Sequence, residues 1–309
     1  MATLLRRLQG PDLAVDLGSA TTRVASASSR RTLKAPSMVG RTRALRGGVV
    51  VEPDCAVEVL RPLFARIRRF GLARPRVVAT VPTDADRDER RTVEEVVRRA
   101  GAAAVALAPE PLAAAIGAEL DLSLPYAQLI VDIGYGVTDC VVVRSGGIIE
   151  SSARRVGCGD LEEALVRYVA DRHGAVISAA AAREAMLGLW LDPEPRWSGR
   201  KKLVCERGGA RGGEVMVELA NLAEALAPAR ERILGVVERL TREVPDGIGA
   251  ELVESGLHLT GGGALLPGLP AALARRTGLR VRRFPDPLGA VIQGGRRLIE
   301  SVTRQGAWS

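Results

Sequence analysis

Residues 15–22 read VDLGSATT, and residues 131–138 repeat the pattern as VDIGYGVT. In both stretches an apolar run ends in an aspartate, Asp16 or Asp132, turns on glycine and small residues, and continues as a second apolar run. Such a turn exposes consecutive backbone N–H groups, which together form a concave site for an anion. Two such turns facing each other would hold a polyphosphate from both sides. The simpler interpretation is a pair of unrelated β-hairpins.

Two more stretches favour the phosphate interpretation. Residues 259–264 (LTGGGA) lead from an apolar strand into a helix, and a glycine run at a helix N-terminus suits close contact with a nucleotide. Glu110 lies between two prolines in residues 108–117 (APEPLAAAIG), where a stiffly held carboxylate could orient a water for attack on a phosphoanhydride. Taken alone, these features are an ordinary strand-to-helix turn and a carboxylate stabilised by a helix dipole.

Strands and helices alternate along the rest of the chain, which predicts an α/β fold. Residues 36–51 contain a proline and several glycines and are expected to be irregular. Residues 193–213 are polar, basic and rich in glycine and proline, which predicts a mobile loop or small insertion. Helical spacing of apolar residues is clearest in four segments: 55–70, 86–100, 160–173 and 219–242.

The composition is that of a folded protein with a basic surface. The 309 residues are 47% hydrophobic and 3% aromatic, with a formal net charge of +8. This hydrophobic content excludes a largely disordered chain, and the charge favours acidic partners such as nucleic acid, anionic lipid or acidic protein. No nucleic-acid recognition motif accompanies the charge, so we expect no specific nucleic-acid binding.

Several classes of site are excluded by residue counts. The four cysteines form no C-x-x-C motif and there are two histidines, which indicates neither a zinc site nor a Ser-His-Asp triad. The N-terminus lacks the pattern of a signal peptide. Residues 100–118 are apolar, but Pro109, Glu110 and Pro111 would break a membrane-spanning helix there. We therefore expect a cytoplasmic protein.

The motifs and their order resemble those of the MreB and Mbl-type bacterial actins. The resemblance extends from about residue 12 to residue 300. It implies the actin/Hsp70/hexokinase fold, with two related, ribonuclease H-like lobes around a nucleotide cleft, ATP and Mg²⁺ as cofactors, and at most slow ATP hydrolysis. The stretches that carry it are DLG at 16–18, EPLAAAIG at 110–117, DIG at 132–134, RVG at 155–157 and LTGGG at 259–263.

The resemblance also assigns roles to residues. It implies that Asp16 and Asp132 face the metal ion, that Glu110 positions the attacking water, and that Thr138 joins Glu110 as a catalytic residue. The remaining residues that it places around ATP are Gly18, Ser19, Ala20, Gly134, Gly136, Gly261, Gly262 and Gly263.

The implied domains are domain I over residues 12–128 and domain II over residues 129–300. Subdomain IIB is expected at about residues 160–240, with a C-terminal segment returning to domain I. Subdomain IB, which in the family supplies part of the contact between filament subunits, is expected to be reduced or absent near residues 36–51. Less buried area should weaken the filament contact, so we expect poor polymerisation alone, or co-assembly with a full-length MreB homologue.

Departures from the family pattern keep other functions open. In the second phosphate loop Tyr135, Val137 and Asp139 stand where the family usually has glycine, threonine and glutamate. Met186 and Gly188 stand where the family usually has lysine and glutamate near the nucleoside. The alternatives are a nucleotide-poor adaptor that co-assembles with MreB, and an ATPase of the sugar kinase/Hsp70 superfamily.

A membrane contact is expected in residues 68–76 (RRFGLARPR), where Phe70 and Leu72 lie among four arginines. Anionic lipid would attract these arginines by about 1 kcal/mol each, and leucines in residues 2–8 could add to the anchor. The alternative is that Phe70 packs on the core. The resemblance implies a peripheral location on the inner face of the membrane, filaments, and cell-wall synthesis or morphogenesis proteins as partners.

Overall fold

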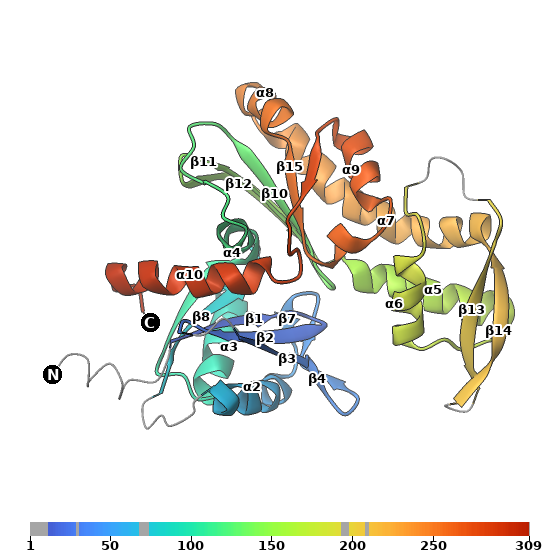
Figure 1. The fold of residues 1–309 in the computed structure, drawn as a ribbon, viewed down its shortest axis with the longest axis horizontal. Helices are drawn as coiled ribbons and strands as arrows, with labels where there is room; N and C mark the ends of the chain where they lie inside the picture. The colour runs from blue at the N-terminus through green and yellow to red at the C-terminus, as the bar shows by residue number, and fades with distance from the viewer. Residues whose placement is uncertain (1–11, 29–30, 68–73, 193–197, 208–209, 309) are drawn as a thin grey trace.

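The computed structural model describes residues 12–28, 31–67, 74–192, 198–207 and 210–308, and shows two lobes with one helical layer between them (Figure 1). Each lobe is built on a five-stranded sheet of the same connectivity, in the orders β3-β2-β1-β8-β9 and β12-β11-β10-β15-β16. The strands of the first sheet are β1 (Leu13–Leu17), β2 (Thr21–Ser26), β3 (Thr32–Pro36), β8 (Arg76–Val81) and β9 (Ala104–Pro109). Those of the second are β10 (Gln128–Ile133), β11 (Thr138–Arg144), β12 (Gly147–Arg154), β15 (Leu257–Thr260) and β16 (Val281–Arg283).

The repeated motif forms the matching hairpin of each sheet, as its pattern predicts. Asp16 on β1 lies opposite Arg23 on β2, and Asp132 on β10 lies opposite Asp139 on β11. Both first strands are fully buried and also pair in parallel with the next strand, β8 or β15. Both aspartates therefore lie near the carboxyl end of a central strand, where ligands commonly bind in open α/β sheets.

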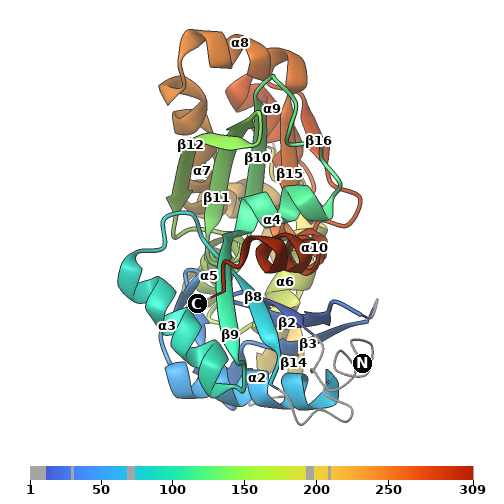
Figure 2. The ribbon, with the colours of Figure 1, turned by 90° about the vertical axis from the view of Figure 1, so that its left-hand side faces the viewer.

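Helices α2 (Pro53–Ile67) and α3 (Arg87–Arg99) cover the outer face of the first sheet (Figure 2). The capping box of α3, formed by Asp86 and Glu89, begins that helix where the sequence predicts it. Phe64 of α2 is fully buried in the core shared by these helices and the sheet.

Residues 38–50 form two short hairpins. These are β4 (Met38–Val39) with β5 (Thr42–Arg43), and β6 (Leu45–Arg46) with β7 (Val49–Val50). Gly47 and Gly48 form the turn of the second hairpin with φ of +59° and +77°, which glycine adopts without strain. No larger subdomain is built from this segment.

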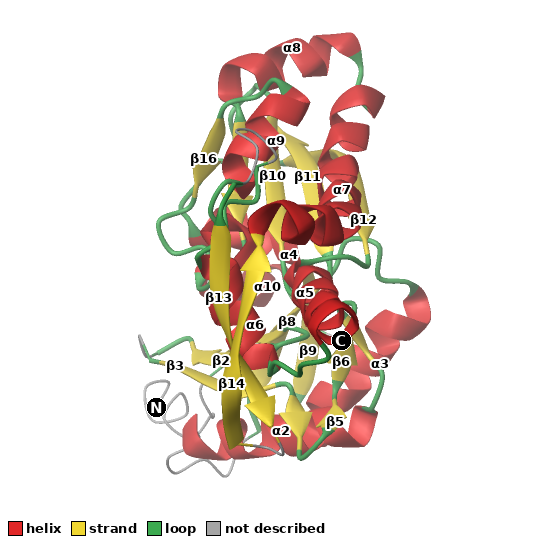
Figure 3. Cartoon of the chain, turned by 90° about the vertical axis from the view of Figure 1, so that its right-hand side faces the viewer, coloured by secondary structure: helices red, strands yellow, loops and turns green. Residues whose placement is uncertain are grey.

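The second lobe carries α5 (Cys158–His173), α6 (Ala179–Leu187), α7 (Leu219–Glu243), α8 (Asp246–Ser255) and α9 (Leu269–Thr277), with a short 3₁₀ turn, η1 (Gly262–Leu265). The expectation of a mobile loop at residues 193–213 is wrong over most of its described part. Strands β13 (Arg200–Arg207) and β14 (Ala210–Glu218) form an antiparallel ribbon there (Figure 3). The ribbon is ordered because Leu203, Cys205 and Val217 on one face join the core of the lobe.

Helices α4 (Glu110–Gly117) and α10 (Ala290–Gln305) form the layer between the two sheets (Figure 1). They pack backbone to backbone, because a Cβ at Gly117 or Gly294 would overlap the opposite helix. Helix α10 also packs Ile292 and Ile299 against the first sheet, while α4 packs its alanines against the second. This layer thus joins the lobes and fixes the start of α4, where Glu110 lies.

The proposed membrane residues Phe70 and Leu72, and residues 2–8, lie outside the described residues. None of the helices in the described part has both the length and the apolar character that crossing a bilayer requires.

Candidate functional site

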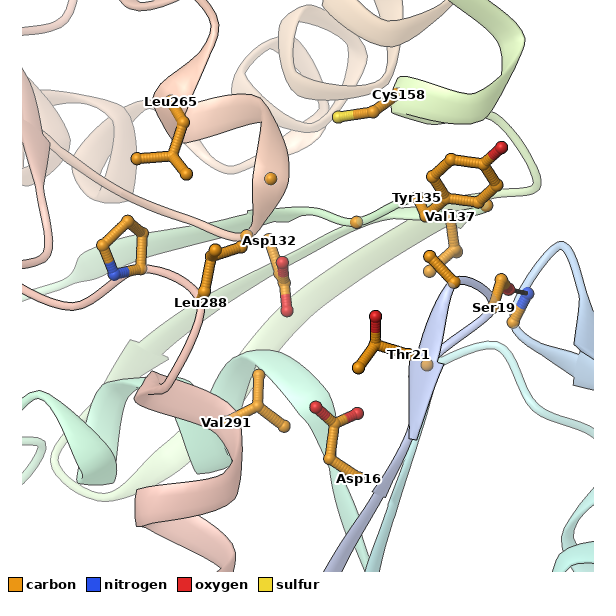
Figure 4. A pocket seen from close by; sticks show the side chains of 18 of the residues that line it. Asp16, Ser19, Thr21, Asp132, Tyr135, Val137, Cys158, Leu265, Leu288 and Val291 are labelled. Carbon is orange, nitrogen blue, oxygen red and sulfur yellow. Dashed lines mark hydrogen bonds between the residues drawn. The ribbon is translucent and has the colours of Figure 1, made fainter. Parts of the chain in front are cut away.

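A cavity of about 330 Å³ opens between the lobes, with Asp16 from one sheet and Asp132 from the other pointing into it (Figure 4). This volume is within the range of small-molecule sites. The residues that line it and that the sequence singled out are Asp16, Gly18, Ser19, Ala20, Glu110, Asp132, Gly134, Gly136, Gly261 and Gly262.

Two of the sequence candidates, Thr138 and Gly263, lie behind the cavity wall. Thr138 is fully buried and its hydroxyl donates to the Val156 carbonyl at 2.8 Å, which secures the turn before α5. A Cβ at Gly263 would come within 2.5 Å of Ile133 Cβ, so this glycine allows η1 to lie against β10.

The two glycine turns touch each other at one end of the cavity. A Cβ at Gly136 would lie 2.7 Å from Ser19 Oγ and 2.9 Å from Gly47 Cα. Ser19 Oγ itself accepts a hydrogen bond from the Gly48 amide at 2.8 Å. Only glycine fits at position 136, and the first lobe, the second lobe and the short β6–β7 hairpin meet there.

Three buried carboxyl groups line the cavity, those of Asp16, Glu110 and Asp132. Burial raises the pKa of Glu110 well above its usual range, and the charges of Asp132, Asp16 and Asp139 add to the shift. Burial, with Asp139 and Asp16, raises the pKa of Asp132 to about 7. Burial therefore favours the protonated form of both Glu110 and Asp132.

Asp16 is engaged by a residue that our sequence analysis missed. Arg23 lines the same cavity, and its Nη1 donates to Asp16 Oδ2 at 3.0 Å. Burial raises the pKa of Asp16, while Arg23 acts to lower it. The signal was available, because a hairpin that turns at residues 18–20 places position 23 opposite position 16.

The carboxyl groups do not form a direct metal site. Among the described residues, no cluster of three or more His, Cys, Asp or Glu side chains is arranged to hold a metal ion. One carboxylate oxygen of Asp16 is already used by Arg23. Arg23 therefore competes for Asp16 with the metal ion that the resemblance implies.

The other half of the cavity is apolar and comes from the second lobe and α10. Met186, one of the positions that departs from the family pattern, is buried in this wall, and Leu187, Leu265 and Leu288 are partly exposed at its edge (Figure 4). Such a surface suits an aromatic base. Gly188 is not among the lining residues.

Tyr135 also lines the cavity. Two guanidinium groups lie near its ring, with the Arg43 carbon 5.8 Å and the Arg183 carbon 5.4 Å from the ring centroid. Arg183 Nε also donates to Glu162 Oε1 at 2.8 Å, and both residues line the cavity. No sequence motif points to Glu162 or Arg183, because α5 and α6 meet only in the folded lobe.

Polar contacts also join the lobes beside the cavity. Arg155 of the second lobe donates from Nη1 to the Gly47 carbonyl at 2.8 Å and pairs through Nη2 with Glu89 at 2.9 Å and Asp84 at 3.1 Å. Asp139 accepts from the Thr83 amide at 2.8 Å and from the Thr83 hydroxyl.

Comparison with known proteins agrees with the two-lobe fold. The protein is similar to MreB5 of Spiroplasma citri bound to ADP, with a TM-score of 0.83 at 21% identity over 96% of this chain and 98% of that one. It is also similar to MamK in a double helical filament, with a TM-score of 0.76 at 18% identity over 94% and 99% of the two chains. These similarities establish the actin-like fold.

Sequence comparison identifies the family. The cell shape-determining protein MreB of Escherichia coli (strain K12) is 30% identical over 358 residues, covering 98% of each chain. The cell shape-determining protein Mbl of Bacillus subtilis (strain 168) is 25% identical over 280 residues, covering 88% of this chain and 84% of the relative. The family model described as MreB/Mbl protein matches residues 31–306. With the match extending over most of both lobes, this chain belongs to the MreB/Mbl family of bacterial actins.

Proposed function

We propose that this chain is a cytoskeletal protein of cell-shape determination that binds an adenine nucleotide in the cavity between its lobes. The observation that carries the proposal is the pair of matching Asp–Gly hairpins that face each other across this cavity. Support also comes from the names of the curated relatives and from the MreB5 structures of S. citri bound to ADP and AMPPNP.

The phosphates would lie on the two glycine turns. Backbone N–H groups at Gly18, Ser19 and Ala20 would contact them from one lobe, and that of Gly136 from the other. The Gly134 N–H donates to the Val137 carbonyl at 2.8 Å, so Gly134 would contribute by shaping this turn. The adenosine would lie along the apolar half, beside Gly261 and Gly262. Mg²⁺ would enter bound to the phosphates, with Asp132 as the carboxyl left to approach its water shell.

Glu110 is proposed to position the attacking water, and its environment predicts slow chemistry. Burial raises the pKa of Glu110 and so favours its protonated form, which is a poor general base. It can still orient a water through a hydrogen bond. Slow hydrolysis follows from this geometry, in keeping with at most a weak ATPase.

The test is calorimetric titration with ATP and Mg²⁺, followed by phosphate release from Glu110→Ala, which removes the group that would orient the water. We expect the variant to bind ATP as the unaltered protein does and to hydrolyse it at least about tenfold more slowly. Glu163→Ala, on the exposed face of α5, is the matched control. Unchanged hydrolysis in Glu110→Ala would remove Glu110 from the mechanism, and no ATP heat at all would favour the nucleotide-poor adaptor.

We also propose weak self-assembly. The E. coli alignment spans 358 residues, more than the 309 of this chain, so the relative carries segments that this chain lacks. The two short hairpins at residues 38–50 offer little surface for a longitudinal contact. Sedimentation with ATP over a concentration series, with electron microscopy, should show short assemblies alone and longer ones with a full-length MreB homologue. Long filaments of this chain alone would show that the reduced segment is dispensable.

The proposed site of action is the inner face of the membrane, with cell-wall synthesis or morphogenesis proteins as partners. Phe70 and Leu72 remain the proposed anchor. Flotation with anionic liposomes should weaken as salt is added, because salt screens the arginines. Equal flotation of a Phe70→Ser, Leu72→Ser double variant would exclude this anchor.

A further inference from the structure

Arg23 and Asp16 form an ion pair inside the cavity. They lie directly opposite each other on β2 and β1, and the N–O distance is 3.0 Å. The Arg23 side chain is 20% exposed and that of Asp16 is 8% exposed, so the pair is largely withdrawn from water while still lining the cavity. Such a pair is screened less by salt than one on the surface.

Few basic side chains line the described part of the cavity, and Arg23 is one of them. Of the described lining residues, those with a basic side chain are Arg23 and Arg183. Arg183 is held by Glu162 in the other half of the cavity, beside Tyr135. Arg23 lies on the same hairpin as the first glycine turn and opposite Asp16, where a polyphosphate would bring several negative charges.

A guanidinium group suits this position chemically. It has five N–H donors, of which one is used on Asp16 Oδ2. The remaining donors can bond phosphate oxygens in the fork geometry that makes arginine a common phosphate ligand. A divalent cation placed against Asp16 would be repelled by the adjacent guanidinium and would compete for the same carboxylate.

We propose that Arg23 serves in place of a divalent cation at Asp16, neutralising this carboxylate and bonding the nucleotide phosphates, so that nucleoside diphosphate binding does not require Mg²⁺. The inference rests on the proposed nucleotide function of the cavity.

The test measures binding of the fluorescent analogue mant-ADP to the full-length chain, in excess MgCl₂ and in excess EDTA. Arg23→Met removes the guanidinium and keeps a side chain of similar length. The matched control is Arg76→Met. Arg76 donates to Asp12 at 2.6 Å in the same sheet, so this variant also loses one Arg–Asp pair, away from the cavity.

For the unaltered protein and for Arg76→Met, we expect dissociation constants in the two buffers that agree within about threefold. For Arg23→Met we expect binding in EDTA to weaken by about tenfold, with partial recovery in MgCl₂ because Asp16 is released to face the metal. If EDTA weakens binding to the unaltered protein tenfold or more, or if Arg23→Met responds to EDTA as the control does, the role of Arg23 is wrong.

Asp16→Asn keeps the inference testable if Arg23→Met does not fold. It removes the carboxylate that a metal would need and leaves Arg23 in place, so mant-ADP binding should be unchanged or tighter in both buffers. A loss of binding confined to MgCl₂ would show that Asp16 serves a metal and would overturn the inference. If the unaltered protein binds mant-ADP in neither buffer, the nucleotide function itself is overturned. If it loses binding in EDTA alone, that function stands and only the role of Arg23 is overturned.

Discussion

Asp139 makes the stability of this protein depend on pH. Its carboxylate accepts two hydrogen bonds from Thr83 of the other lobe, yet burial dominates and raises its pKa from the ordinary 3.8 of an aspartate to about 7. The folded state therefore binds this proton more tightly than the unfolded state does. The contribution of Asp139 to the free energy of unfolding is greatest at acid pH, and it is lost as the pH rises from about 4 through about 7.

We expect Asp139→Asn to flatten this dependence, because the amide carries no charge and can still accept a bond from Thr83. Thermal unfolding between about pH 5 and pH 8 should show a smaller loss of melting temperature with rising pH than in the unaltered protein. Asp121→Asn is the control, since hydrogen bonds from Ser123 lower the pKa of that exposed carboxyl and the effect has the opposite sign. Parallel curves for Asp139→Asn and the unaltered protein would contradict the prediction.

A substitution at Gly136 would test the contact between the two glycine turns. In Gly136→Ala the new methyl would lie 2.7 Å from Ser19 Oγ and 2.9 Å from the Gly47 backbone, so the lobes must separate. We expect a loss of about 1–3 kcal/mol in the free energy of unfolding, together with weaker mant-ADP binding. Gly235→Ala in α7 meets no atom within 4 Å and should instead stabilise by about 0.5–1 kcal/mol. Urea titration of both variants measures these changes in the free energy of unfolding, and equal values for the two variants would contradict the prediction.

At the scale of elements, local patterns predicted most of the strands and helices, but contacts between distant segments were not predictable. The Asp–Gly repeat and the glycine turns indicated both central hairpins, and these form as expected. The ribbon at residues 200–207 and 210–218 was missed because its glycine and basic residues are typical of loops, while its stability comes from packing on the lobe. Likewise, the pairing of Arg155 with Glu89 joins positions 66 residues apart, which no local pattern encodes.

The crossing of α4 and α10 is the most sensitive packing contact between elements. A Cβ at Gly294 would overlap the Ala113 backbone of α4, so Gly294→Ala must push the helices apart. We expect a loss of about 3 kcal/mol of stability, and slower ATP hydrolysis because Glu110 begins α4. The neighbouring Gly295→Ala would place its methyl 3.2 Å from Ala14 Cβ, a contact that small shifts can relieve. Equal melting of the two variants would contradict this account of the crossing.

At the scale of the whole molecule, the two lobes are joined in two places. One is the helical layer of α4 and α10, whose close backbone packing resists change. The other is the set of polar contacts beside the cavity, in which Arg155 and Asp139 of the second lobe bond Gly47, Glu89 and Thr83 of the first. Part-exposed ion pairs contribute about 0–1 kcal/mol each, so this second junction can open at far lower cost than the first. Opening there would widen the cavity while the helical layer acts as the hinge.

Arg155→Met should therefore open the molecule without unfolding it. The variant loses the bond to the Gly47 carbonyl and both ion pairs, to Glu89 and Asp84. Small-angle X-ray scattering of the nucleotide-free variant should give a larger radius of gyration than the unaltered protein, and saturating ADP should reduce the difference because the phosphates bridge the two turns. Arg154→Met is the control, since Arg154 bonds the Ala153 carbonyl within its own lobe. The melting temperature should fall only slightly, as expected for a loss of about 1–3 kcal/mol. An unchanged radius in Arg155→Met would mean that the helical layer alone sets the angle between the lobes.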